Sequence, residues 1–359
     1  MTEHALAPES VELPSTRQIV RRLAVVAALL AVGGLVATQL PGLQDIGHQL
    51  AGANAGWIAA ALLLQLASTA SFALAFHGVY DRRPSPRASA SMSMAVQGMN
   101  TVLPSGGAGG LAIGAVLLDR AGVPRSFAAS RTVALFLITS LVSFAAVVIA
   151  GFGVATGALS GEATLTLTLL PAAAALLLIV AVFALPRSQG PLQSASAGRL
   201  STAIASAREY LREGVGASAE LLRSGDRLVI VGAIGYFAFD VAALAAAFHA
   251  LGPAGLPIGL LVLAYTLGHG GAIVPIPGSA EGGLIAMFVL YGVSLPTATA
   301  AVLAYRAMHA GVPIVLGAIG LADVRRLLRD PARVVAPKAR IKLRDRPAYL
   351  ASQPATARA

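Results

Sequence analysis

The sequence predicts an all-α polytopic membrane protein, with about six full spans and two broken or re-entrant helical hairpins in an inverted repeat. Hydrophobic residues make up 56% of the chain and charged residues 12%, whereas soluble domains carry about 25% charged residues. Lys and Arg gather in the tails and in segments between apolar runs, as the positive-inside rule requires. Two apolar stretches are interrupted by Pro and Gly.

Composition also narrows the class of function. The absence of Cys excludes disulfides and thiolate metal sites. A net charge of +10 would suggest nucleic acid in a soluble protein, but here the bases flank apolar spans, so we expect no nucleic-acid partner. The sequence shows no metal-ligand cluster, no nucleophile–base pair and no phosphate loop. It therefore predicts no metal, no cofactor and no enzymatic activity.

The first half begins with a polar cytoplasmic tail, residues 1–22, followed by an uncharged apolar run over 23–40. A signal peptide is the alternative, but no small-residue cleavage site follows Leu40, which favours an uncleaved first span. The loop 41–55 lacks Lys and Arg and is expected outside. The run 56–79 then returns to an arginine-rich inner segment.

The next apolar segment predicts the first hairpin. Residues 91–103 and 107–118 are each shorter than the roughly 20 residues that cross a bilayer. A re-entrant hairpin that turns at a Pro/Gly break keeps the following bases inside. The predicted break residues are Pro104, Gly106 and Gly107.

Residues 132–152 and 164–185 are expected to cross outward and back. The arginine-rich segment 186–227 joins the repeat halves. Within it Leu200, Ile204, Ala207, Leu211 and Val215 share one helical face, which predicts an amphipathic helix on the inner leaflet. A solvated linker helix is the alternative.

Residues 228–251 are expected to cross outward, and 300–320 to cross inward to a basic tail, 321–359. The segment 256–274 leaves two possibilities open: it crosses fully, or it begins a second re-entrant hairpin. Both possibilities leave the two termini cytoplasmic. We therefore expect a multi-pass protein of the inner (plasma) membrane, with a transmembrane domain over 23–320.

The second broken stretch repeats the pattern of the first. Gly98 and Gly271 lie 173 positions apart, and Pro104 and Pro277 share that offset. The same offset places 56–79 over 228–251, which run in opposite directions. The sequence thus predicts inverted halves, roughly 56–185 and 228–320. The predicted break residues of the second copy are Pro275, Pro277 and Gly278.

Several polar residues are candidates for a binding site. Helix N-termini at the breaks attract anions, and an arginine follows each break, Arg131 and Arg306. Glu281 either complements the helix dipole or pairs with Arg306 or with a cationic substrate group. Asp240 and His269 are cavity candidates, although Asp240 is equally suited to bonding a neighbouring hydroxyl. Asn100 either satisfies the backbone freed at the break or contacts substrate.

Two segments resemble a known family. The segment VPIPGSAEGG with a following AYR, and QGMNTVLPSGGAGGLAIGAVLLDRAGVP, are similar to the two signatures of the lysylphosphatidylglycerol synthase transmembrane (flippase-like) family. The resemblance covers roughly residues 20–325. Members often carry an arginine and an acid after the first proline, where this chain has Ser-Gly-Gly-Ala-Gly-Gly. The resemblance implies the lipid-translocating half without the soluble synthase domain.

These observations predict a lipid translocase that binds an anionic phospholipid headgroup, or a lipid-linked substrate, in a midplane cavity. The alternatives are a proton-coupled transporter of a small anion, an intramembrane enzyme acting on a lipid-linked substrate, and a scaffold. The sequence identifies neither the lipid nor the energy source, and it leaves homo-oligomerisation open.

Overall fold

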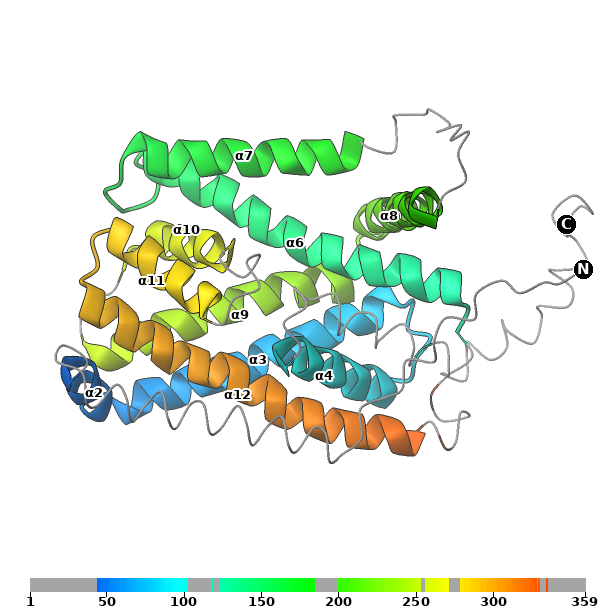
Figure 1. The fold of residues 1–359 in the computed structure, drawn as a ribbon, viewed down its shortest axis with the longest axis horizontal. Helices are drawn as coiled ribbons and strands as arrows, with labels where there is room; N and C mark the ends of the chain where they lie inside the picture. The colour runs from blue at the N-terminus through cyan, green and yellow to red at the C-terminus, as the bar shows by residue number, and fades with distance from the viewer. Residues whose placement is uncertain are drawn as a thin grey trace, which may run out of the picture.

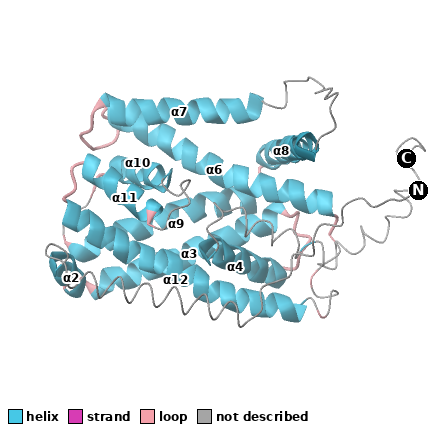
Figure 2. Cartoon of the chain, viewed as in Figure 1, coloured by secondary structure: helices cyan, strands magenta, loops and turns pink. Residues whose placement is uncertain are grey.

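The computed structural model describes residues 44–102, 118, 123–184, 199–252, 256–270, 278–327, 329 and 334. The predicted first span, the basic tail and five of the predicted break residues (Pro104, Gly106, Gly107, Pro275 and Pro277) lie outside these residues. The described chain is helical, and Figure 2 shows no strand in it. Its helices are α2 (Gln44–Ala51), α3 (Ala55–Val79), α4 (Pro86–Val102), α6 (Arg125–Ala155), α7 (Leu165–Ala184), α8 (Arg199–Ser224), α9 (Arg227–Leu251), α10 (Ile258–His269), α11 (Ser279–Leu290) and α12 (Leu295–Leu327).

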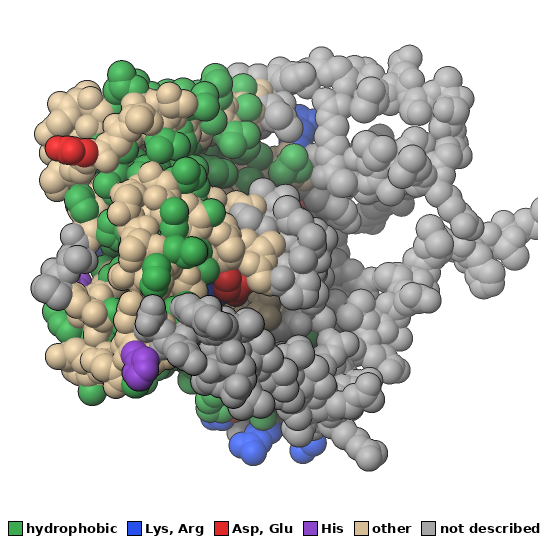
Figure 3. Space-filling view, turned by 60° about the vertical axis from the view of Figure 1, so that its left-hand side comes forward, with side chains coloured by type: hydrophobic (Ala, Val, Ile, Leu, Met, Phe, Trp, Pro, Cys, Tyr) green, Lys and Arg blue, Asp and Glu red, His purple; other side chains and the backbone are tan. Residues whose placement is uncertain are grey.

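Five described helices are long and apolar enough to cross a membrane: α3, α6, α7, α9 and α12. They coincide with the spans predicted at 56–79, 132–152, 164–185, 228–251 and 300–320. Their outer surfaces are apolar, and Leu170 and Leu177 on α7 are 66% and 69% exposed. Figure 3 shows hydrophobic side chains spread over one such face, with few charged groups among them. The all-α polytopic fold class is confirmed.

The pair α3 and α9 forms the centre of the fold (Figure 1). Each begins at a capping side chain, because Asn54 accepts from the Gly56 N–H at 2.9 Å and Asp226 from the Leu228 N–H at 2.9 Å. The start of α3 lies beside the end of α9, so the two helices run antiparallel. Gly232 permits their close approach, since a Cβ there would lie 2.4 Å from the Ala75 nitrogen.

Two further contacts cross between the predicted repeat halves. Helix α4 packs on α12, where a Cβ at Gly317 would lie 2.6 Å from the Cα of Gly98. Helix α10 packs on α6, where a Cβ at Gly259 would lie 2.5 Å from Val154 Cγ2. The short helix of each half therefore lies against the long helix of the other half.

Helices α10 and α11 are half-length and pack on each other. Each has 12 residues and is about 18 Å long, well short of the roughly 30 Å hydrocarbon core. A Cβ at Gly268 would lie 2.7 Å from the Cα of Leu284, so backbone meets backbone. Gly278 precedes α11 with φ 85°, in the left-handed region where glycine is favoured. Neither half-helix crosses the membrane alone.

Helix α8 crosses the direction of the spans. Figure 1 shows it nearly end-on, while α6 and α12 run across the page. It packs on α6, where a Cβ at Gly214 would lie 2.2 Å from Val133 Cγ1. Val215 of the predicted apolar face is buried, whereas Leu211 of the same face is exposed. The prediction placed this face against the inner leaflet, and at Val215 it is covered by protein.

Candidate functional site

Asp240 is a buried carboxylate in the middle of the span α9, with only 2% of its surface exposed. Three side chains from two other helices bond to it. The hydroxyls of Tyr265 on α10 and Tyr305 on α12 both donate to Oδ2, the latter at 3.0 Å. His309 Nδ1 lies 3.1 Å from Oδ1. A buried charge is costly unless it is paired, and here every contact is to a donor.

Hydrogen-bond geometry assigns the imidazole tautomers. Because the single Tyr305 hydroxyl proton goes to Asp240, His309 Nδ1 must carry the proton that it donates to the carboxylate. His269 Nδ1 lies 2.7 Å from the carbonyl oxygen of Tyr265, which can only accept, so this nitrogen also carries a proton. In each neutral ring Nε2 is therefore the nitrogen without a proton.

Glu281 and Arg306 form an ion pair beside these groups. Arg306 Nε donates to Glu281 Oε1 at 2.7 Å, and Nη2 lies 2.7 Å from the same oxygen. The side chains are 29% and 23% exposed, so the pair is only partly enclosed. Glu281 lies in the first turn of α11, where its charge also favours the helix dipole.

Together these residues make one polar cluster at the meeting of four helices. We define it as Asp240, Tyr265, His269, Glu281, Tyr305, Arg306 and His309. The rings of His269 and His309 lie 6.1 Å apart between centroids and connect its two sides. Ionisable groups inside spans are rare and mark binding sites or transport paths. The cluster is the candidate site.

Three members of the cluster were not among the residues predicted from sequence: Tyr265, Tyr305 and His309. A signal for them exists, because Tyr-x-x-x-His occurs at 265–269 and again at 305–309. An i, i+4 spacing places both side chains on one helix face. Each tyrosine was inconspicuous alone, but the repeated pair marks the two faces that meet at Asp240.

Arg131 lies in a separate network. It is 8% exposed and pairs with Asp81 at 3.2 Å and with Glu220 at 3.7 Å. Arg82, next to Asp81, pairs with Asp226 at the start of α9, which is about 21 Å along the helix from Asp240. The structure thus brings Arg306, Glu281, Asp240 and His269 together, and places Arg131 apart from them.

Two other features lie near the Arg131 network. Tyr80 packs in the apolar core, and burial raises the pKa of its hydroxyl, which shares a hydrogen bond of 2.6 Å with Thr132. The Phe127 ring lies beneath the guanidinium of Arg83 at 3.7 Å. Asn100, the remaining predicted site residue, lies in the last turn of α4, the helix that packs on α12.

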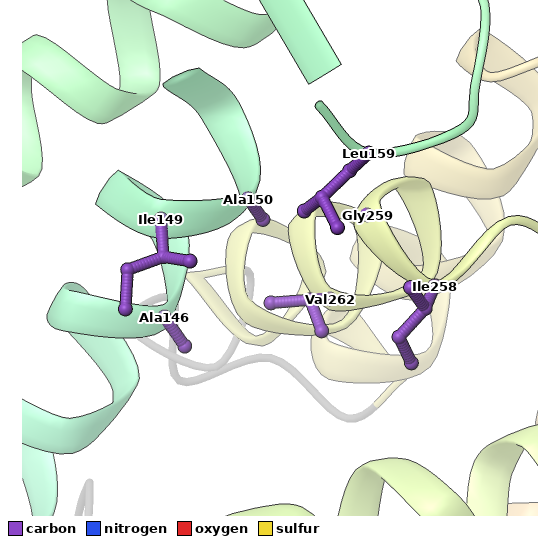
Figure 4. Close-up of a pocket in the computed structure, with 7 residues that line it drawn as sticks. All are labelled: Ala146, Ile149, Ala150, Leu159, Ile258, Gly259 and Val262. Atoms are coloured by element: carbon purple, nitrogen blue, oxygen red, sulfur yellow. The ribbon is translucent and has the colours of Figure 1, made fainter. Parts of the chain in front are cut away.

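A cavity of about 240 Å³ opens between α6 and α10 (Figure 4). Its lining is apolar: Ala146, Ile149, Ala150, Leu159, Ile258, Gly259 and Val262. A charged headgroup would lose its hydration there without gaining a partner. The cavity therefore suits a hydrocarbon segment, and it is not the polar midplane cavity that the sequence predicted.

Among the described residues, no three His, Cys, Asp or Glu side chains are arranged to hold a metal ion.

Comparison with known proteins identifies a family. No curated protein matches the chain. The family described as "Lysylphosphatidylglycerol synthase TM region" matches residues 19–317, which is most of the chain and includes the whole polar cluster. The chain therefore belongs to the lysylphosphatidylglycerol synthase transmembrane family.

Proposed function

We propose that the protein binds the anionic headgroup of a phospholipid at the polar cluster and moves the lipid between leaflets. The observation that carries the proposal is the ion pair of Arg306 and Glu281, which is partly enclosed within apolar helices and lies beside the buried Asp240 network. The family match adds a relation to lipid handling. We propose this role as transport, with no covalent chemistry.

The physical barrier to lipid movement is the cost of taking a charged headgroup through hydrocarbon. A guanidinium presents a planar fork of donors that matches phosphate oxygens. Arg306 uses two of its nitrogens on one Glu281 oxygen and keeps part of its surface exposed. A headgroup phosphate can therefore compete with Glu281 for this arginine.

The arrangement of the helices supports an inverted repeat with re-entrant hairpins. Helices α3 and α9 run antiparallel, and α4 and α10 each pack on the long helix of the opposite half. Helices α10 and α11 form a pair in which neither member is long enough to cross. Many transporters bind substrate at such broken helices near the midplane. The apolar cavity between α6 and α10 would take an acyl chain.

The orientation is proposed from charge. The ion pairs Arg82–Asp226 and Arg87–Asp323 join helix ends that should lie on the same, cytoplasmic side of an inner membrane. Both termini would then be cytoplasmic. A cysteine introduced at Glu162, which is exposed in the opposite loop, should react with an impermeant thiol reagent in intact cells. If that cysteine did not react, the loop would lie on the cytoplasmic side and the proposed orientation would be wrong.

The proposal is tested by Arg306→Ala in liposomes that carry a labelled anionic lipid. Lipid movement should be abolished, and Arg306→Lys should recover only part of it because a point charge does not reproduce the fork. The matched control is Arg87→Ala, which breaks an exposed arginine–carboxylate pair outside the cluster. Normal movement in correctly inserted Arg306→Ala protein would contradict the phosphate site.

A second candidate function is proton-linked transport of a small soluble anion, favoured by the contact between Asp240 and His309. Both functions use the same anion site. They differ in whether acyl chains are needed for binding, which a headgroup without chains would reveal.

A further inference from the structure

We infer that the site takes up a proton together with the anionic headgroup, and that His269 Nε2 is the atom that receives the proton and donates it to a phosphate oxygen. This inference rests on the proposed function and names a second ligand of the same site. It is carried by the geometry of the polar cluster.

The first observation is the state of His269. Its Nδ1 proton is committed to the Tyr265 carbonyl, so the neutral ring offers a lone pair at Nε2. That nitrogen is enclosed and has no hydrogen-bond partner within the described part of the chain. An unpaired polar atom in an apolar helix bundle is costly, and a proton shared with an anion would satisfy it.

The second observation is the charge of the cluster. The cluster holds two carboxylates, Asp240 beside His309 and Glu281 beside Arg306, but only one guanidinium, that of Arg306. With both imidazoles neutral, the cluster carries one net negative charge and would repel an anion. One proton on an imidazole makes the cluster neutral, and two make it positive.

The titratable and charged groups that act on His269 come from three helices: Asp240 on α9, Tyr265 on α10, and Arg306 and His309 on α12. Arg306 is in turn paired with Glu281 on α11. The described titratable side chain of α6, Arg131, is committed to Asp81 and Glu220 at the inner end.

Imidazole is the side chain whose charge ordinarily changes near neutral pH. Of the two in the cluster, His309 already donates to Asp240, and its ring is held by Tyr305 at 2.9 Å. At His269, by contrast, Nε2 is enclosed and has no partner among the described residues. A protonated His269 would give the phosphate a second charge-assisted donor besides Arg306. Headgroup affinity should therefore be high at low pH and fall as pH rises.

The test is calorimetric binding of a short-chain phosphatidylglycerol to the purified full chain, in two buffers of different protonation enthalpy. We expect net uptake of a fraction of a proton per lipid near neutral pH. Affinity should rise between about pH 8 and about pH 6, by at most about tenfold per pH unit. His269→Gln, a neutral donor, should still bind lipid but lose the proton uptake and the pH dependence.

His249→Gln is the matched control, since His249 stacks on Trp57 near the end of α9, away from the cluster. It should keep the wild-type proton uptake. Lipid binding by the wild-type chain without proton uptake would overturn the inference and leave the proposed function intact. Failure of the wild-type chain to bind any anionic lipid would overturn both. Glycerophosphoglycerol, the headgroup without acyl chains, distinguishes a lipid site from a site for a soluble anion. Proton uptake on binding glycerophosphoglycerol but not on binding the lipid would mean that the proton site serves a soluble anion.

Discussion

Asp240 is a buried carboxylate that donors from two neighbouring helices hold in place. Its carboxylate would be prohibitive in hydrocarbon without partners, and it receives donors from Tyr265, Tyr305 and His309. These bonds connect α9, α10 and α12 at one point. The network therefore fixes the relative positions of three of the four helices that carry the candidate site.

Removing one of these donors should be costly. We predict that Tyr305→Phe lowers the free energy of unfolding by about 1.5–3 kcal/mol, the range for a hydrogen bond to a charged group. Tyr291→Phe is the matched control, because the Tyr291 hydroxyl donates to the neutral Leu167 carbonyl at 2.9 Å. This variant should lower the free energy of unfolding by only about 0.5–1.5 kcal/mol. Thermal unfolding of both variants in the same detergent measures the difference. An equal loss would mean that Asp240 is not a buried charge in the folded protein.

Sequence reasoning found the charged members of the site but not the aromatic ones. Glu281, Arg306 and Asp240 stand out because charge is rare in apolar segments. Tyr265 and Tyr305 do not, because tyrosine is common at membrane interfaces and only the fold shows that these two reach a carboxylate. In the sequence, Arg131 is associated with Arg306 only because each arginine follows a break of the predicted repeat. Repeat symmetry does not fix the partner of a side chain, and Arg131 is held by Asp81 and Glu220.

At the scale of helices, glycine positions decide which spans approach closely. Gly98 and Gly317 let α4 and α12 meet backbone to backbone, as small residues do in membrane bundles. Span cores were predictable from hydropathy, whereas helix ends were not. The predicted span 300–320 is the apolar core of the longer helix α12, Leu295–Leu327. Its last turns carry Asp323, whose partners Arg87 and Ser91 lie on α4 and are invisible to a hydropathy window.

The contact between α4 and α12 should tolerate no added side chain. We predict that Gly317→Ala lowers the free energy of unfolding by about 1–3 kcal/mol, because its Cβ would lie 2.6 Å from the Gly98 Cα and the helices must separate. Gly311→Ala in the same helix is the control. Among the described residues, no atom beyond its own stretch of helix lies within 4 Å of its Cβ position, so alanine should be neutral or stabilising there. A tolerated Gly317→Ala would show that the two helices are not in this close contact.

At the scale of the whole molecule, the polar cluster joins the central helix pair to the half-helices. Asp240 belongs to α9, which pairs with α3, while His269 and Glu281 lie on α10 and α11. The candidate site is therefore built from the broken second half, and the apolar cavity lies at the start of α10, toward α6. The fold class and the repeat offset follow from sequence because both depend on hydropathy and spacing. The cluster does not, because it depends on how four helices pack.

We propose that the chain moves an anionic lipid between leaflets. The most direct measurement is the loss of fluorescence when dithionite is added to liposomes that hold the purified protein and a nitrobenzoxadiazole-labelled phosphatidylglycerol. Protein-free liposomes should lose only the signal of their outer leaflet, because dithionite does not cross the bilayer. With the protein, we expect the fluorescence of labelled phosphatidylglycerol to fall beyond that level. The additional fall should be smaller for labelled phosphatidylcholine, whose headgroup has no net charge. Identical loss with and without correctly inserted protein would contradict the account.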